Sequence, residues 1–126
     1  MNKIAMAVHG GAGEISDFIL SNEKKCEKGL QEALLTGHRI LKNGGSALDA
    51  VEAAVCVLED DPHFNAGRGS TLNCHGEIAM DASIMDGKTL KAGAVSMIRE
   101  VKNPVSLARK IMEKNPSCFF IRLWGP

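Results

Sequence analysis

The sequence predicts an α+β fold, and three observations support this prediction. The first half of the 126-residue chain has two stretches in which apolar residues recur every three or four positions, the spacing of amphipathic helices. Between residues 65 and 98, short strand-like runs alternate with glycine-containing turns. A last helical pattern follows Asn103-Pro104. We therefore expect about four strands and three helices.

The N-terminal run from Ile4 to Val8 is apolar and leads into His9 and a glycine-rich loop. It predicts a buried strand that delivers the backbone to this loop. Gly10 and Gly11 allow positive φ and close approach of the backbone to other groups. The loop lacks the Lys-Ser/Thr end of a P-loop and the spacing of a dinucleotide site. A tight turn without further function is the alternative interpretation.

Two helices are predicted next. The first runs from about Ser16 to Leu41 and ends at Asn43-Gly44-Gly45. The second begins after Ser46, an N-cap residue followed three positions later by Asp49 in a weak form of the capping box, and continues to Leu58. We expect these helices to cover one face of a sheet.

The loop that follows contains three carboxylates in a row, Glu59, Asp60 and Asp61. Calcium and magnesium sites usually space their carboxylates at alternate positions, so a side-chain metal site is not expected here. Asn65 ends the loop, and its amide can both donate and accept hydrogen bonds. It is the best candidate in the loop for a side chain that reaches a functional site. A turn or capping role is the equal alternative.

An antiparallel meander is predicted from three runs: Thr71 to Cys74, Glu77 to Asp86 and Leu90 to Ile98. Adjacent strand residues point to opposite faces, so Cys74 is poorly placed to use His75 as a base. The last helix is expected between Asn103-Pro104 and Asn115-Pro116.

Composition argues against several function classes. The chain has 15 basic and 15 acidic residues, which gives no electrostatic reason to expect nucleic acid or an anionic membrane as a partner. No apolar run approaches the roughly 20 residues of a membrane helix, and the N-terminal run is too short for a signal peptide. The four cysteines show no C-x-x-C pair and are expected to be reduced thiols. A cytoplasmic protein is expected.

Four motifs, taken together, resemble one known family. They are His9-Gly10-Gly11-Ala12-Gly13, Asn65 to Ser70, Met80 to Gly87, and Ala92 to Val95 with Asn103 to Arg109. In this order they resemble the plant-type L-asparaginase and isoaspartyl peptidase family of N-terminal-nucleophile hydrolases. The resemblance defines residues 1–118 as the N-terminal, α-fragment part of the domain. Residues 119–126 do not resemble the family's continuation and are interpreted as a divergent tail.

The resemblance implies a fold and a reaction. Members form an αββα sandwich in which strands of two fragments share the sheets, so this chain is expected to give an incomplete sandwich with a partly uncovered sheet. Members hydrolyse L-asparagine to L-aspartate and ammonia, and cleave isoaspartyl peptides, with a threonine nucleophile released by autoproteolysis. That threonine lies outside this chain, so no catalytic residue is expected in it and the chain alone is expected to be inactive.

The resemblance also implies site residues and partners. His9, Gly10, Gly11 and Asn65 would border the active site. A structural Na⁺ would be held by main-chain carbonyls, at positions Leu58, Glu59, Asp61, Phe64, Ala66 and Arg68, and no catalytic cofactor is implied. The amide or isoaspartyl substrate would bind only the complete enzyme, and a β fragment or full-length homologue would be needed for stable folding. The alternative is a truncated isoform that acts as a non-catalytic binding or assembly-modulating chain.

Overall fold

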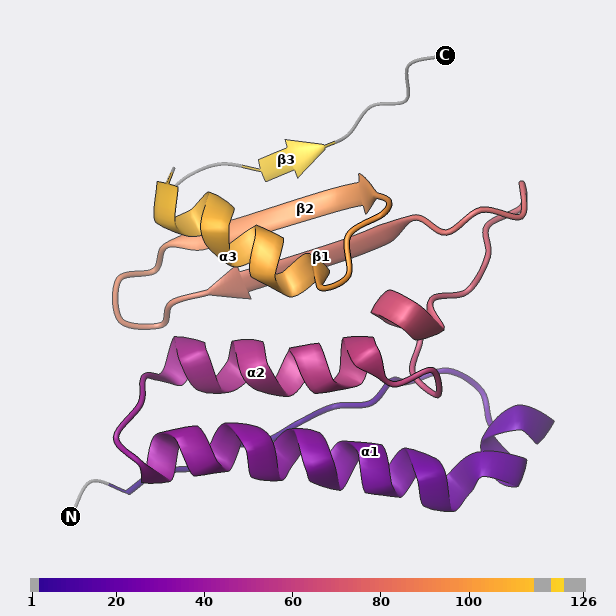
Figure 1. Ribbon diagram of the computed structural model, residues 1–126, viewed down its shortest axis with the longest axis horizontal. Helices are drawn as coiled ribbons and strands as arrows, with labels where there is room; N and C mark the ends of the chain where they lie inside the picture. The colour runs from indigo at the N-terminus through magenta and orange to yellow at the C-terminus, as the bar shows by residue number, and fades with distance from the viewer. Residues whose placement is uncertain (1–2, 115–118, 122–126) are drawn as a thin grey trace.

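The computed structural model describes residues 3–114 and 119–121 and has an α+β architecture, which confirms the predicted class. Figure 1 shows α1 and α2 side by side, with α3 lying across the sheet. Among the described residues, no helix combines the length and apolarity needed to cross a membrane. The elements in chain order are α1 (Asp17–Lys42), α2 (Ala47–Asp60), a 3₁₀ turn (Gly67–Gly69), β1 (Met80–Met85), β2 (Ala92–Ile98), α3 (Pro104–Lys114) and β3 (Phe119–Ile121).

The helix boundaries follow local signals in the sequence. Ser16 caps α1, and its hydroxyl accepts a hydrogen bond from the backbone N–H of Ile19 at 3.4 Å. Ser46 and Asp49 form the full capping box of α2, in which each side chain accepts from the other residue's backbone N–H. Pro104 is the first residue of α3, where its missing N–H costs nothing. All three predicted helices are confirmed.

The sheet has the order β1-β2-β3, with β1 antiparallel and β3 parallel to β2. Two of the three predicted runs form these strands, in shorter versions. The predicted strand from Thr71 to Cys74 is wrong: Asn73 folds into a turn and accepts hydrogen bonds on its side-chain oxygen from the N–H groups of His75 and Glu77. The asparagine side chain competes with strand pairing because it satisfies backbone donors locally.

The predicted N-terminal strand from Ile4 to Val8 is also wrong within the described chain. The segment is assigned to no strand and pairs with none. Met6 and Val8 are nevertheless half-buried against α1 and α2. A strand needs a hydrogen-bonded neighbour, which a run of apolar residues cannot supply by itself. The hydrophobic pattern therefore predicted the burial and not the pairing.

A β-bulge interrupts the pairing of β1 and β2. Ala82 lies opposite Val95 and Met80 opposite Ile98, so β2 carries an extra residue. The Asp81 carboxylate accepts hydrogen bonds from the Ser96 hydroxyl at 2.6 Å and from the Met97 N–H at 2.8 Å. These bonds, with that from Ser96 the stronger influence, lower the pKa of Asp81. Met97 has φ +54°, so Asp81 holds a non-glycine residue in the left-handed region.

Two hydrophobic clusters make up the core, and α2 contributes to both. One lies between the sheet and α3, and the other between α1 and α2 around Phe64. At Gly93 of β2, a Cβ atom would overlap the carbonyl oxygen of Ala108 and lie 2.6 Å from the backbone nitrogen of Met112. The absence of a side chain there lets the sheet and α3 approach each other closely.

The opposite face of the sheet is open. Asp81, Ser83 and Met85 of β1 are exposed, as is Met97 of β2. The two methionines are apolar, yet their exposed fractions are 54% for Met85 and 43% for Met97. Within the described chain, helices therefore cover only one face of the sheet. This agrees with the predicted partly uncovered sheet.

Candidate functional site

The glycine loop and the segment around Asn65 meet in the fold. A Cβ atom added at Gly10 would lie 3.0 Å from the Leu30 side chain and 3.1 Å from the Phe64 ring. Phe64 is buried and directly precedes Asn65. The structure thus brings together two motifs that lie more than fifty positions apart in the sequence, and it does so at the α1–α2 core.

The polar groups of the two motifs, in contrast to Gly10 and Phe64, have hydrogen-bond partners within their own loops. His9 is exposed, and its Nδ1 accepts a hydrogen bond from the backbone N–H of Gly11 at 3.1 Å. Gly11 has φ +136°, a conformation that favours glycine. The Asn65 Oδ1 accepts from the backbone N–H of Thr71 at 3.0 Å and from the Thr71 hydroxyl at 3.3 Å. Asn65 therefore stabilises its own loop through the oxygen, while its amide nitrogen remains a donor for another group.

The neighbouring carboxylates have separate structural partners. The Asp61 carboxylate lies 2.6 Å from His63 Nδ1, and the His63 ring stacks on Phe18. Glu59 is buried, and its two oxygens accept hydrogen bonds from the Val105 N–H and the Asn103 amide. Burial raises the pKa of Glu59, and these two bonds partly oppose that effect. Glu59 thereby fixes the N-terminus of α3 to the end of α2.

The predicted cation loop contains main-chain carbonyl oxygens that lie close to neighbouring backbone atoms. The carbonyls of Leu58, Asp61, Phe64 and Ala66 each accept one backbone N–H. At Gly67 a Cβ atom would clash with the Glu59 carbonyl, and at Gly69 with the Phe64 carbonyl. Each carbonyl keeps a second lone pair, and hard cations prefer oxygen ligands, so the chemistry of this donor set fits Na⁺. No group of three or more His, Cys, Asp or Glu side chains among the described residues is arranged to hold a metal.

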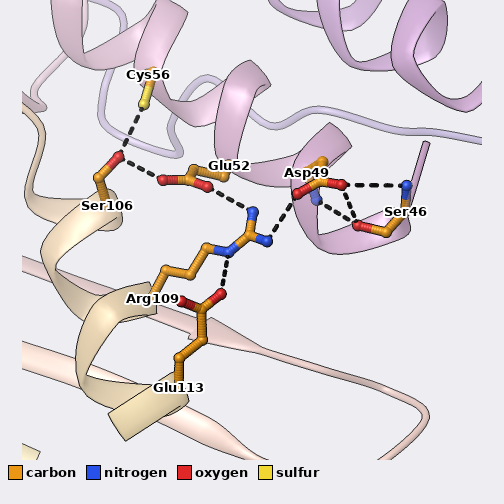
Figure 2. A network of polar contacts seen from close by, with 7 residues as sticks. All are labelled: Ser46, Asp49, Glu52, Cys56, Ser106, Arg109 and Glu113. Atoms are coloured by element: carbon orange, nitrogen blue, oxygen red, sulfur yellow. Dashed lines mark hydrogen bonds and ion pairs between the residues drawn. The ribbon is translucent and has the colours of Figure 1, made fainter.

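Sequence reasoning missed a polar network between α2 and α3, shown in Figure 2. Arg109 of α3 forms ion pairs with Asp49 and Glu52 of α2, each at 2.7 Å, and with Glu113 at 2.8 Å. The Ser106 hydroxyl donates to Glu52 at 2.6 Å. The four-residue spacing of Arg109 and Glu113 was the one available signal in the sequence. Every group in the network has a partner, which indicates a structural junction.

The thiol beside this junction is not activated. Cys56 Sγ lies 3.6 Å from the Ser106 hydroxyl. Burial raises the pKa of Cys56, with a smaller contribution of the same sign from Glu59 and Glu52. A raised pKa keeps the thiol protonated at neutral pH, and the thiolate is the reactive form. The raised pKa therefore disfavours the reactive thiolate form of Cys56.

A groove was also missed, beside the predicted cation loop. Arg99 pairs with Glu77 through both guanidinium nitrogens, at 3.1 and 2.5 Å. Apolar side chains and several further charged residues line the rest of the groove. The lining residues are Asp60, Gly67, Arg68, Glu77, Ile78, Met80, Arg99, Glu100, Val101 and Lys102.

The architecture and the motifs define the class of protein first. Helices on one face of an open sheet, with the glycine loop packed beside Phe64, correspond to a partial α+β fold of the N-terminal-nucleophile hydrolases. The family model described as Asparaginase matches residues 2–122. The chain belongs to this family, and the resemblance seen in the sequence is confirmed.

Two relatives are similar to this chain over almost its whole length. The human protein named isoaspartyl peptidase/L-asparaginase is 55% identical over 119 residues, which is 94% of this chain and 38% of the human protein. The plant-type L-asparaginase of Pyrococcus furiosus is 57% identical over 118 residues, again 94% of this chain and 38% of the relative. The chain thus spans little more than a third of the length of these relatives.

Proposed function

We propose that this chain supplies the N-terminal scaffold of an enzyme that hydrolyses L-asparagine to L-aspartate and ammonia and cleaves isoaspartyl peptides. The observation that carries the proposal is the 55% identity to the human isoaspartyl peptidase/L-asparaginase over 94% of the chain. The named activity belongs to the relative. At this level of identity, extending across all four motifs, the same chemistry is the best-supported assignment for a complete protein containing this chain.

In the proposed mechanism, a threonine freed at a new N-terminus by autoproteolysis attacks the amide carbon, and its own amine accepts the hydroxyl proton. The ammonia or amine leaves, and water then hydrolyses the ester. The threonine would come from the part of the relatives that this chain does not match. The chain alone would therefore be inactive.

The residues of this chain would shape one border of that site. His9, Gly10 and Gly11 would bring backbone groups close to the reacting centre. Asn65, whose oxygen is occupied by Thr71, would present its amide nitrogen as a hydrogen-bond donor. A Na⁺ on the neighbouring carbonyls would stiffen the loop that carries Asn65.

The test is an activity assay of the 126-residue chain, alone and co-expressed with the part of the human relative that lies outside the matched region. We expect no release of ammonia from L-asparagine and no cleavage of an isoaspartyl dipeptide by the chain alone. The combination is expected to do both. Hydrolysis by the chain alone, or an assembled but inactive combination, would contradict the proposal.

The contribution of Asn65 can be tested in the same combination. Asn65→Ala is expected to lower the activity, whereas Asn22→Ala on α1 serves as the control. Asn22 makes its hydrogen bonds within its own helix, donating to the Phe18 carbonyl and accepting from the Lys25 ammonium group. Equal activity of the two variants would remove Asn65 from the site.

A second candidate is a non-catalytic chain that binds intact family members and modulates their assembly. The open sheet face favours it, because exposed Met85 and Met97 lie on a surface able to pack against another layer. Mixing the chain with the intact human relative would test this. Loss of activity together with co-elution supports the modulating role, and unchanged activity without co-elution excludes it.

The proposed location is the cytoplasm. Cys26, Cys56 and Cys74 are free thiols in the described chain, in keeping with a reducing compartment. Fluorescence microscopy of the tagged chain, with signal from an oxidising compartment as the contradicting result, tests this assignment.

A further inference from the structure

A cleft of about 520 Å³ lies between α1 and the end of α2 with the loop that follows it. Clefts that bind small molecules usually have volumes of about 300–1,000 Å³, so this one is large enough for a metabolite. In Figure 1 the end of α2 and the loop after it lie beside α1. One wall of the cleft is therefore helical, and the other is formed by the α2 end and the loop.

The two walls carry different charges. On the α1 wall, Lys25 and Lys28 are three positions apart and share one side of the helix, and Glu32 lies one turn further along. The facing wall has the carboxylates of Asp60 and Asp61, and its described lining residues include no lysine or arginine. Positive charge is thus concentrated on α1, and carboxylates face it from the loop.

Gly29 lets the two walls approach each other. A Cβ atom at this position of α1 would lie 2.5 Å from Asp61 Oδ2 and 2.6 Å from the Phe64 ring. The absence of a side chain allows the loop to pack directly against the helix backbone. Val57 and Pro62 contribute the apolar part of the lining. The walls are therefore close enough for one small molecule to touch both.

Two of the carboxylates retain bonding capacity toward the cleft. Asp61 uses Oδ1 for the backbone N–H of His63 at 2.9 Å and for its ring at 2.6 Å, which leaves Oδ2 facing α1. Glu32 has no side-chain partner among the described residues. Asp60 differs, because it is paired with Lys102 at 3.1 Å. Asp61 and Glu32 are therefore the acceptors available to a cationic group.

The lysines on the α1 wall are also available. Lys25 donates to the side-chain oxygen of Asn22 at 3.1 Å, and an ammonium group has three donors. Lys28 makes no side-chain hydrogen bond or ion pair with any described residue. A carboxylate lying between the two lysines would receive charge-assisted hydrogen bonds from both.

We propose that this cleft binds a small zwitterion of the amino acid class. The ligand's carboxylate lies between Lys25 and Lys28, and its ammonium group donates to Asp61 Oδ2 and Glu32. A ligand with a single charge would satisfy one wall and leave the charges of the other without a partner, whereas a zwitterion satisfies both. The inference goes beyond the proposed function, because it uses side chains to which that reaction assigns no role.

The experiment is a chemical-shift titration of the 126-residue chain by NMR. L-alanine, β-alanine and 4-aminobutanoate are the zwitterionic probes, and they separate the two charged groups by increasing distances. Acetate and ethylammonium, at the same ionic strength, carry one charge each. We expect at least one zwitterion to bind about tenfold more tightly than either single-charge probe, with shifts concentrated at residues 25–32 and 57–63.

Two substitutions on α1 test the assigned roles. Lys28→Gln should weaken binding of the zwitterion and of acetate by about fivefold or more, and Glu32→Gln should weaken the zwitterion and ethylammonium similarly. Lys24→Gln and Glu27→Gln are the matched controls, because they remove the same charges from exposed positions of α1 outside the cleft. Both should bind normally. Glutamine has nearly the helix propensity of lysine and glutamate, so all four variants should fold.

Circular dichroism establishes that the helices are formed in the titrated samples. Where the chain alone is not helical, the same titration is made on its combination with the remaining part of the human relative, and the four variants locate the binding.

Three results would overturn the inference: equal affinity for zwitterionic and single-charge probes, normal binding by both cleft variants, or no saturable shift below about 10 mM. None of these measurements uses enzymatic activity. Failure of this inference would therefore leave the proposed function intact, and an inactive enzyme would leave the binding result unchanged.

Discussion

The junction between α2 and α3 and the N-terminal segment present opposite cases of packing in one chain. At the junction, Glu59 holds the start of α3 and Arg109 pairs with three carboxylates, so the polar groups are matched. In the N-terminal segment, residues 4–10, Met6 and Val8 pack against the helices, and the backbone is not paired within the described chain. The helix α2 takes part in both.

The difference shows which contacts a helix-rich portion of a fold can complete by itself. A helix satisfies its backbone hydrogen bonds internally, so only its side chains need a neighbour. A strand satisfies its backbone only through another strand. The junction needs α2 and α3, which this chain contains, whereas residues 4–8 and the outer edge of β1 have no strand beside them in the described chain.

The packing of α3 against the sheet can be disrupted at Gly93 of β2, and the largest effect is expected there. Gly93→Ala places a methyl group against the backbone of α3, and we expect a loss of about 3 kcal/mol in the free energy of unfolding. Urea titration followed by circular dichroism measures it. Gly87→Ala is the control, since a Cβ atom there meets nothing within 4 Å. Similar losses at both positions would show that backbone conformation, and not the contact with α3, is responsible.

A smaller effect is expected from Glu59 at the junction. Glu59→Ala leaves the Val105 N–H and the Asn103 amide without their acceptor, which should cost about 2 kcal/mol of stability. Glu59→Gln retains an acceptor oxygen and should cost less. The two variants are compared by urea titration at neutral pH. A glutamine variant as unstable as the alanine variant would show that the charge, rather than hydrogen bonding, holds α3.

The bulge at Asp81 adds a pH dependence. Its lowered pKa means that ionised Asp81 stabilises the fold above the unfolded-state pKa, and that this contribution is lost as the pH falls through the lower folded-state pKa. Asp81→Asn should cost about 1 kcal/mol at neutral pH and reduce the loss of stability between neutral pH and about pH 3. Melting temperatures across that range measure the effect, with Ser83→Ala on the same strand as control. An unchanged pH profile would contradict the role of the carboxylate.

The smallest effect on the stability of the isolated chain is expected at the open face of the sheet. Met85 is 54% exposed, so Met85→Ser should change stability by less than about 0.5 kcal/mol. The same variant should bind the remaining part of the human relative more weakly, as measured by calorimetry, because apolar area would be lost from the covered surface. Lys88→Ser, in the turn after β1, is the control for binding. Full affinity of the Met85 variant would show that the open face stays uncovered.

The sequence by itself determined the helices and the family. Ser46 with Asp49, and Pro104 at the start of α3, are local signals whose effect needs no distant residue. The motifs around His9, Asn65 and Asp81 identified the family because each of them is an unbroken run of residues that can be recognised without the fold. The approach of the glycine loop to Phe64 could not be read from them, since it depends on how α1 and α2 pack.

Tertiary structure decided which of the strand-like runs pair and how the polar junction forms. The runs from Ile4 to Val8 and from Thr71 to Cys74 have strand-like patterns, but one lacks a neighbouring strand and the other is folded into a turn by Asn73. Arg109 meets Asp49 and Glu52 only because α3 packs on α2. The physical reason is the same in each case: a helix closes its hydrogen bonds within one segment, whereas strand pairing and ion pairs between elements depend on residues far away in the sequence.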